Sequence, residues 1–169
     1  MPLPATLSND PLTIYLNDHL GGSAFGLELA RRARASNRGN EFGAFLDELT
    51  AAIEEDRRDL ERIIEHLGRP RDQLKSAAGW LAEKAGRLKP NGRLVGYSPL
   101  SRLLELEGLN GGVQAKLALW RALQAIAPSE ARLDERELDR LIGRAETQLE
   151  GIAAMQVRAA EVALAGARL

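Results

Sequence analysis

Four long stretches of the chain repeat apolar residues at the three- and four-residue spacing of an amphipathic helix. They cover about 11–36, 41–68, 98–127 and 134–166. Residues that favour helix starts and turns separate them, namely Asp10-Pro11, the turn Asn37–Asn40, Ser98-Pro99, and Asp134 with Glu137 three residues later. The pattern predicts an all-α chain with four long helices.

The lengths of the connections predict how these helices pack. Short turns near residues 38 and 130 make the first and second helices, and the third and fourth, two antiparallel hairpins. Residues 69–98 form a longer connection with its own short amphipathic helix, which permits either an up-down-up-down order or parallel second and third helices. We favour the parallel order slightly. The prediction is a four-helix bundle with a long helix-containing crossover, in which residues 1–10 are a tail and 11–169 one domain.

Composition supports this class and excludes several kinds of site. The 169 residues are 44% hydrophobic, which is enough for one core, and only 4% aromatic, which favours helix over sheet. A net charge of −1 gives no overall field for nucleic acid or an anionic membrane. The absence of cysteine excludes disulfides, thiolate zinc sites and cysteine nucleophiles. No leader peptide or membrane-spanning run is recognisable, so we expect a cytoplasmic protein without a membrane role.

One polar residue interrupts the expected core face of each long helix. These residues are His19, Asp56, Glu107 and Gln156. Counting outward from the two turns places His19 within one helical turn of Asp56, and Glu107 beside Gln156. A buried carboxylate is costly unless it is paired or binds a metal, so Asp56 and Glu107 both require partners.

Two interpretations of this polar layer remain open. The favoured one is a hydrogen-bond network that fixes helix register, with His19 beside Asp56 and Gln156 beside Glu107; no cofactor is then expected. The other is a divalent metal, iron or manganese, held by His19, Asp56 and Glu107 with Gln156 as a neighbour. Helix-weakening glycines beside the layer indicate either close helix packing, which we favour, or a ligand cavity. They are Gly22, Gly26, Gly108, Gly111, Gly112 and Gly151.

Two long helix hairpins, a long crossover and one inward polar residue per helix resemble the ferritin-like superfamily. Di-iron members of that superfamily carry Glu on the first and third helices and Glu-x-x-His on the second and fourth. Glu107 matches the third-helix position, whereas His19, Asp56 and Gln156 stand where glutamates would be. Asp59 and Ala159 stand where the two histidines would be, so both Glu-x-x-His motifs are missing. The resemblance therefore implies a divergent member whose metal site is reduced or lost.

The expected function is that of a non-enzymatic structural or interaction protein. The alternative is a metal-binding protein or oxidoreductase that uses His19, Asp56 and Glu107, so enzymatic activity stays open. A second apolar face on the third helix, together with Phe25, predicts a homo-oligomer; this face comprises Leu106, Leu109, Val113, Leu117 and Trp120. Arg87, Lys89, Arg93 and Tyr97 could contact phosphates, but nucleic-acid binding is disfavoured because no recognised motif accompanies them.

Overall fold

Four long helices form the part of the chain that the computed structural model describes, residues 10–71 and 96–166. They are α1 (Pro11–Ser36), α2 (Glu41–His66), α4 (Pro99–Ile126) and α5 (Glu135–Leu164), with a single 3₁₀ turn, η1 (Ala127–Ser129), after α4. Within these residues there is no strand, which confirms the all-α prediction. The predicted crossover helix and nearly all of the predicted tail lie outside the described residues.

The helices begin and end where the capping residues predict. The Asp10 carboxylate accepts a hydrogen bond from the Thr13 amide at 2.8 Å, and Pro11 is the first residue of α1. Ser98 and Asp134 cap α4 and α5 in the same way. Gly39, in the turn after α1, has a φ of 84°, a left-handed conformation that glycine adopts without strain.

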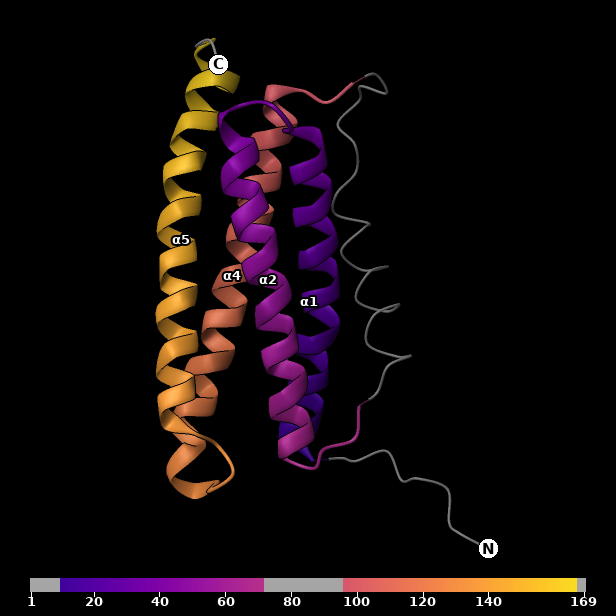
Figure 1. The fold of residues 1–169 in the computed structure, drawn as a ribbon, viewed down its shortest axis with the longest axis vertical. Helices are drawn as coiled ribbons and strands as arrows, with labels where there is room; N and C mark the ends of the chain where they lie inside the picture. The colour runs from indigo at the N-terminus through magenta and orange to yellow at the C-terminus, as the bar shows by residue number, and fades with distance from the viewer. Residues whose placement is uncertain (1–9, 72–95, 167–169) are drawn as a thin grey trace, which may run out of the picture.

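The helices pack as a bundle in which α1 contacts α2 and α4, and α5 contacts the same two helices (Figure 1). Side-chain contacts fix the relative directions. Asn37 at the end of α1 bonds Tyr97 just before α4, and Arg62 near the end of α2 pairs with Glu137 near the start of α5. In Figure 1, α1 and α5 accordingly run in one direction, and α2 and α4 in the other.

The core face of α4 differs from the expected one. Leu106, Leu109, Val113, Leu117 and Trp120 are buried, whereas Glu107 and Gly111 are exposed. The larger side chains remove more apolar area from water, so they outweigh the glycine and alanine face in setting the orientation of the helix. The placement of Glu107 in the core was therefore wrong. The face expected to bind a second copy belongs to the core, and Phe25 packs against that core too.

The glycines fall into two groups. A Cβ atom on Gly108 would lie 2.9 Å from Leu29 Cδ2, and one on Gly151 would lie 2.8 Å from Phe45 Cε2, so both positions are closely packed. A Cβ atom on Gly26, Gly111 or Gly112 would meet nothing within 4 Å. Close helix packing therefore accounts for Gly108 and Gly151 but not for the other three.

Among the described helices, none combines the length and apolar character needed to cross a membrane.

Candidate functional site

Asp56 is the centre of a buried ionic network at mid-bundle. It lies on the core face of α2, 2% exposed, as its place in the apolar stripe predicts. Its carboxylate accepts hydrogen bonds from Arg144 Nε at 2.7 Å, from Gln148 Nε2 at 2.9 Å and from Lys116 Nζ. Lys116 also donates to Gln148 Oε1, so the three helices α2, α4 and α5 are joined at one point.

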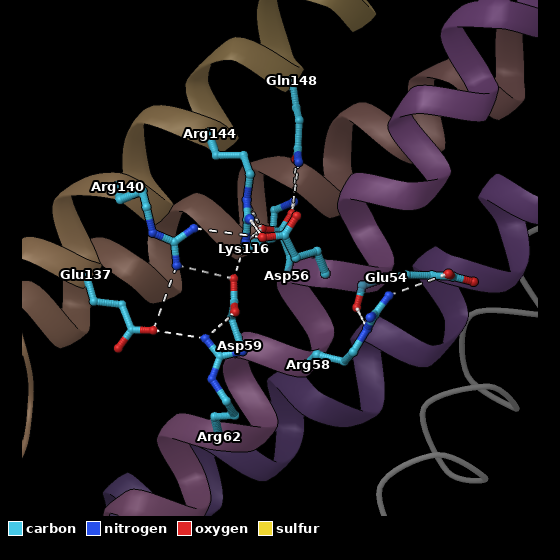
Figure 2. Close-up of polar contacts among 11 residues, drawn as sticks. Glu54, Asp56, Arg58, Asp59, Arg62, Lys116, Glu137, Arg140, Arg144 and Gln148 are labelled. Carbon is cyan, nitrogen blue, oxygen red and sulfur yellow. Dashed lines mark hydrogen bonds and ion pairs between the residues drawn. The ribbon is translucent and has the colours of Figure 1, made fainter.

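Asp59, one turn further along α2, extends the network toward α5. It is 1% exposed and accepts from Arg144 Nη2 as well as from Arg62 Nη2, the latter at 2.5 Å. Arg140 and Glu137 surround this pair, and Figure 2 shows the two aspartates of α2 pointing toward these side chains of α5. The contact set holds Glu55, Asp56, Asp59 and Glu137 against Arg62, Lys116, Arg140 and Arg144, so its formal charges cancel.

Burial and pairing act on the basic members in opposite directions. Burial lowers the pKa of Lys116 more than the Asp56 carboxylate raises it, so the pKa of Lys116 is lowered overall. Burial also lowers the pKa of Arg144, but Asp56 and Asp59 outweigh this effect, so its pKa is raised overall. A cation in this position is stable only while the aspartates face it, because an unpaired buried charge is strongly unfavourable.

His19 is not the partner of Asp56. Its imidazole is half-buried and contacts the Tyr15 ring edge to face, with 4.6 Å between ring centroids. It makes no hydrogen bond or ion pair with the residues that the structure describes. His19 and Asp56 nevertheless lie at similar heights along the bundle, as the count from the turn predicts, because both line one cavity between α1, α2 and α4.

The other predicted pair, Glu107 with Gln156, does not form. Glu107 is exposed on the outer face of α4, and Gln156 is half-buried and accepts a long hydrogen bond from Asn110, at 3.4 Å. Asn110 lies three residues after Glu107, about one helical turn along α4. Gln156 therefore contacts α4 near the predicted height in the bundle, but through Asn110 and not through Glu107.

The side chains do not fit the iron or manganese site that the alternative interpretation requires. Three protein donors already occupy the Asp56 carboxylate, and Glu107 points away from the core. Nowhere in residues 10–71 and 96–166 do three His, Cys, Asp or Glu side chains gather to hold a metal ion. Lys116 and Arg144 stand beside Asp56 where a cation would be needed, which supplies the compensating charge from the protein itself.

Sequence reasoning missed Lys116, Arg144, Gln148 and Asp59. The signal was present, because Lys116 lies three residues after Val113 and four before Trp120, which places it on the buried stripe of α4. Arg144 and Gln148 flank the stripe Leu141, Ala145 and Ile152 in the same way. Charged residues at such positions are usually assigned to the solvent side. Here Asp59 is buried, and the side chains of Lys116 and Arg144 are only 15% and 18% exposed, because opposite charges face them.

A second polar cluster joins the α1–α2 turn to the start of α4. Arg102, 5% exposed, donates from Nε to Asn37 Oδ1 at 2.5 Å, and its guanidinium lies 4.6 Å from the centroid of the Phe42 ring. Tyr97 donates its hydroxyl to Glu105 at 2.9 Å and accepts from Asn37 at 2.7 Å. Burial raises the pKa of the Tyr97 phenol above its usual range. The cluster fixes the end of α1 against α4.

Comparison of the chain with protein-family models, with curated proteins and with solved structures finds no match.

The half-buried His19 imidazole gives the folded state a pH dependence. Burial lowers the pKa of His19, against an opposing effect of Asp18, so the unfolded chain binds this proton at a higher pH than the folded chain does. The stabilisation from neutral His19 is thus complete above about pH 6.5 and declines as the pH falls through that value. We expect urea midpoints of the wild type to fall between pH 7.5 and 5.5, and to fall less in His19→Gln.

The exposed His66 provides the control for this experiment, since it is the only other histidine. His66→Gln should retain the wild-type pH dependence. Equal losses for the wild type and His19→Gln over the same pH range would contradict the assignment to His19.

Proposed function

We propose that this protein is a non-enzymatic, ferritin-like helical bundle that acts as a structural or interaction protein. In this proposal the buried ionic network stands where a di-iron protein of that superfamily would bind its metal. The observation that carries it is the Asp56 carboxylate, to which Lys116, Arg144 and Gln148 all donate.

Helix directions agree with the ferritin-like part of the proposal. α2 and α4, which follow one another along the chain, run in the same direction, as a long crossover between two antiparallel hairpins requires (Figure 1). Neither Glu-x-x-His motif is present, since Asp59 follows Asp56 and Ala159 follows Gln156 at the third position. In this proposal the bundle retains the helix order of the ferritin-like superfamily, and salt bridges occupy its centre in place of metal ligands.

Elemental analysis tests the proposal. Protein purified without chelators is expected to contain no stoichiometric iron, manganese or zinc, and its melting temperature should not rise when any of these ions is added, because a ligand that binds the folded state must stabilise it. One metal ion per chain, lost in His19→Ala, would overturn the proposal in favour of the metal-binding alternative.

A further inference from the structure

A cavity of about 240 Å³ lies between α1, α2 and α4, beside Asp56. Its lining is mainly apolar and includes Ile53, Leu109 and Val113. For comparison, an engineered apolar cavity of roughly 150 Å³ in another protein binds benzene. The cavity between these three helices is therefore large enough for a benzene ring that carries one or two small substituents.

Glycines border this cavity on two sides. Gly22 and Gly26 belong to the α1 wall, and Gly112 belongs to the α4 wall. A Cβ atom on Gly26 or Gly112 would meet no atom within 4 Å, so helix packing does not require glycine at either position. Glycine within a helix also lowers helix stability relative to alanine. The cavity thus lies where two facing helices both lack side chains.

His19 borders the cavity with an imidazole that has no partner among the described residues. It lies on the core side of α1, three residues after Leu16 and one before Leu20, both of which are buried. In the described part of the chain, the closed side-chain nitrogens and oxygens without a hydrogen bond are Arg69 Nε, Arg102 Nη1 and Trp120 Nε1. The ring nitrogens of His19 are not in this set, so a small molecule can reach them.

The charged residues of the lining indicate an uncharged ligand. Lys116 and two other side chains already donate to the Asp56 carboxylate, and Arg57 donates to Ser23 Oγ at 2.7 Å. Asp18 is the other acidic residue of the lining, so two formal negative charges face the two positive charges of these basic side chains. Neither sign is in excess to select an ion, and the imidazole is left to bond a ligand.

The chemistry of the imidazole indicates which polar group suits it. Burial lowers the pKa of His19, so its neutral form prevails at pH 7.5. A neutral imidazole has one ring nitrogen that donates a hydrogen bond and one that accepts. A hydroxyl group both donates and accepts, so it can bond whichever nitrogen faces the cavity.

We propose that this cavity binds a small, uncharged, mainly apolar molecule with one hydroxyl group, of the size of a substituted phenol. Its apolar part fills the space between the glycines, and its hydroxyl bonds the His19 imidazole. The site is separate from the function proposed above, since it needs neither a metal nor a partner protein.

Titration of the ¹⁵N-labelled full-length protein with p-cresol at pH 7.5 tests the proposal. The chain has two histidines, so His66→Gln assigns the ring ¹⁵N resonances of His19. p-Cresol should shift these resonances saturably. p-Xylene, in which a methyl group replaces the hydroxyl, fills the same space without bonding the imidazole, so it should shift them much less at saturation.

His19→Leu separates the hydrogen bond from the apolar contacts. The ratio of the affinity for p-cresol to that for p-xylene, measured by calorimetry, should fall on the order of tenfold, because the hydroxyl loses its partner. The affinity for p-xylene itself should change little. His66→Leu makes the same substitution at an exposed position and should leave both affinities unchanged.

A pair of neighbouring glycines gives a matched control for the position of the site. Gly112→Leu places a side chain in the cavity and should weaken p-cresol binding by roughly tenfold or more, because it occupies part of the volume. Gly111→Leu makes the same change one residue away, outside the lining, and should leave the affinity unchanged. Gly26→Leu fills the cavity from α1 and serves as a second variant if Gly112→Leu does not fold.

Three results would each overturn the proposal. One is the absence of any saturable shift of the His19 ring resonances at millimolar p-cresol. Another is an equal shift with p-xylene, or an unchanged affinity ratio in folded His19→Leu, either of which removes the role of the imidazole. The last is unchanged binding in folded Gly112→Leu and Gly26→Leu, which would place the ligand elsewhere.

Discussion

Replacement of Asp56 by alanine is expected to lower the free energy of unfolding by about 3–5 kcal/mol, because it leaves buried cations without their counter-charge. Lys116 has a side chain that is only 15% exposed, and Asp56 is its ion-pair partner. Arg144 would keep Asp59 and Glu55, so most of the cost should come from Lys116. Urea denaturation followed by far-ultraviolet circular dichroism measures the change.

Glu54→Ala is the matched control, on the same helix two residues earlier. Glu54 pairs with Arg31, whose side chain is 48% exposed, and an exposed pair of this kind contributes at most about 1 kcal/mol. The double variant Asp56→Ala/Lys116→Met should be more stable than Asp56→Ala alone, because the unpaired ammonium is then removed. A cost for Asp56→Ala no larger than that for Glu54→Ala would contradict a central role for the network.

The helices and the burial of Asp56 could be predicted because each depends on local pattern. Asp10, Ser98 and Asp134 cap helices by hydrogen bonds to amides two or three residues away, and such contacts are visible in sequence. Asp56 lies in an otherwise continuous apolar stripe, so its burial followed from helical spacing alone. These predictions needed no knowledge of which helix packs against which.

The partners of Asp56 could not be predicted in the same way. α4 has two faces that can pack, and the choice between them decides whether Glu107 or Lys116 points inward. A prediction that takes the glycine and alanine face of α4 as the core face places Glu107 inside and Lys116 outside. His19 is then the nearest available partner for Asp56. The correct choice depends on the total apolar area buried against three other helices, which is a property of the whole bundle.

The two interpretations of the glycines likewise turned on tertiary structure. Close packing is correct for Gly108 and Gly151, whereas Gly26 and Gly112 border a cavity. Sequence alone cannot separate these cases, because each depends on what the opposite helix places at that level. Gly108 faces Leu29 of α1, but Gly112, one turn later, faces the stretch of α1 that contains Gly22 and Gly26.

Arg102→Ala is expected to lower the free energy of unfolding by about 2–4 kcal/mol, through loss of a cation–π contact and of a charged hydrogen bond. The guanidinium lies 4.6 Å from the Phe42 ring centroid and 5.7 Å from that of Tyr97, and its Nε donates to Asn37. These contacts join the α1–α2 turn to the start of α4, so the substitution removes a direct contact between the two hairpins. Urea denaturation again gives the magnitude.

Arg102→Lys distinguishes the shape of the guanidinium from its charge. Lysine keeps the charge but cannot stack a planar group on Phe42 while it donates to Asn37, so this variant should recover less than half of the loss. Arg121→Ala is the control on the same helix, because Arg121 pairs with Glu146 and both side chains are exposed, at 58% and 48%. Its cost should stay below about 1 kcal/mol. Full recovery in Arg102→Lys would show that charge alone matters there. A similar cost for Arg121→Ala and Arg102→Ala would contradict the importance of burial at Arg102.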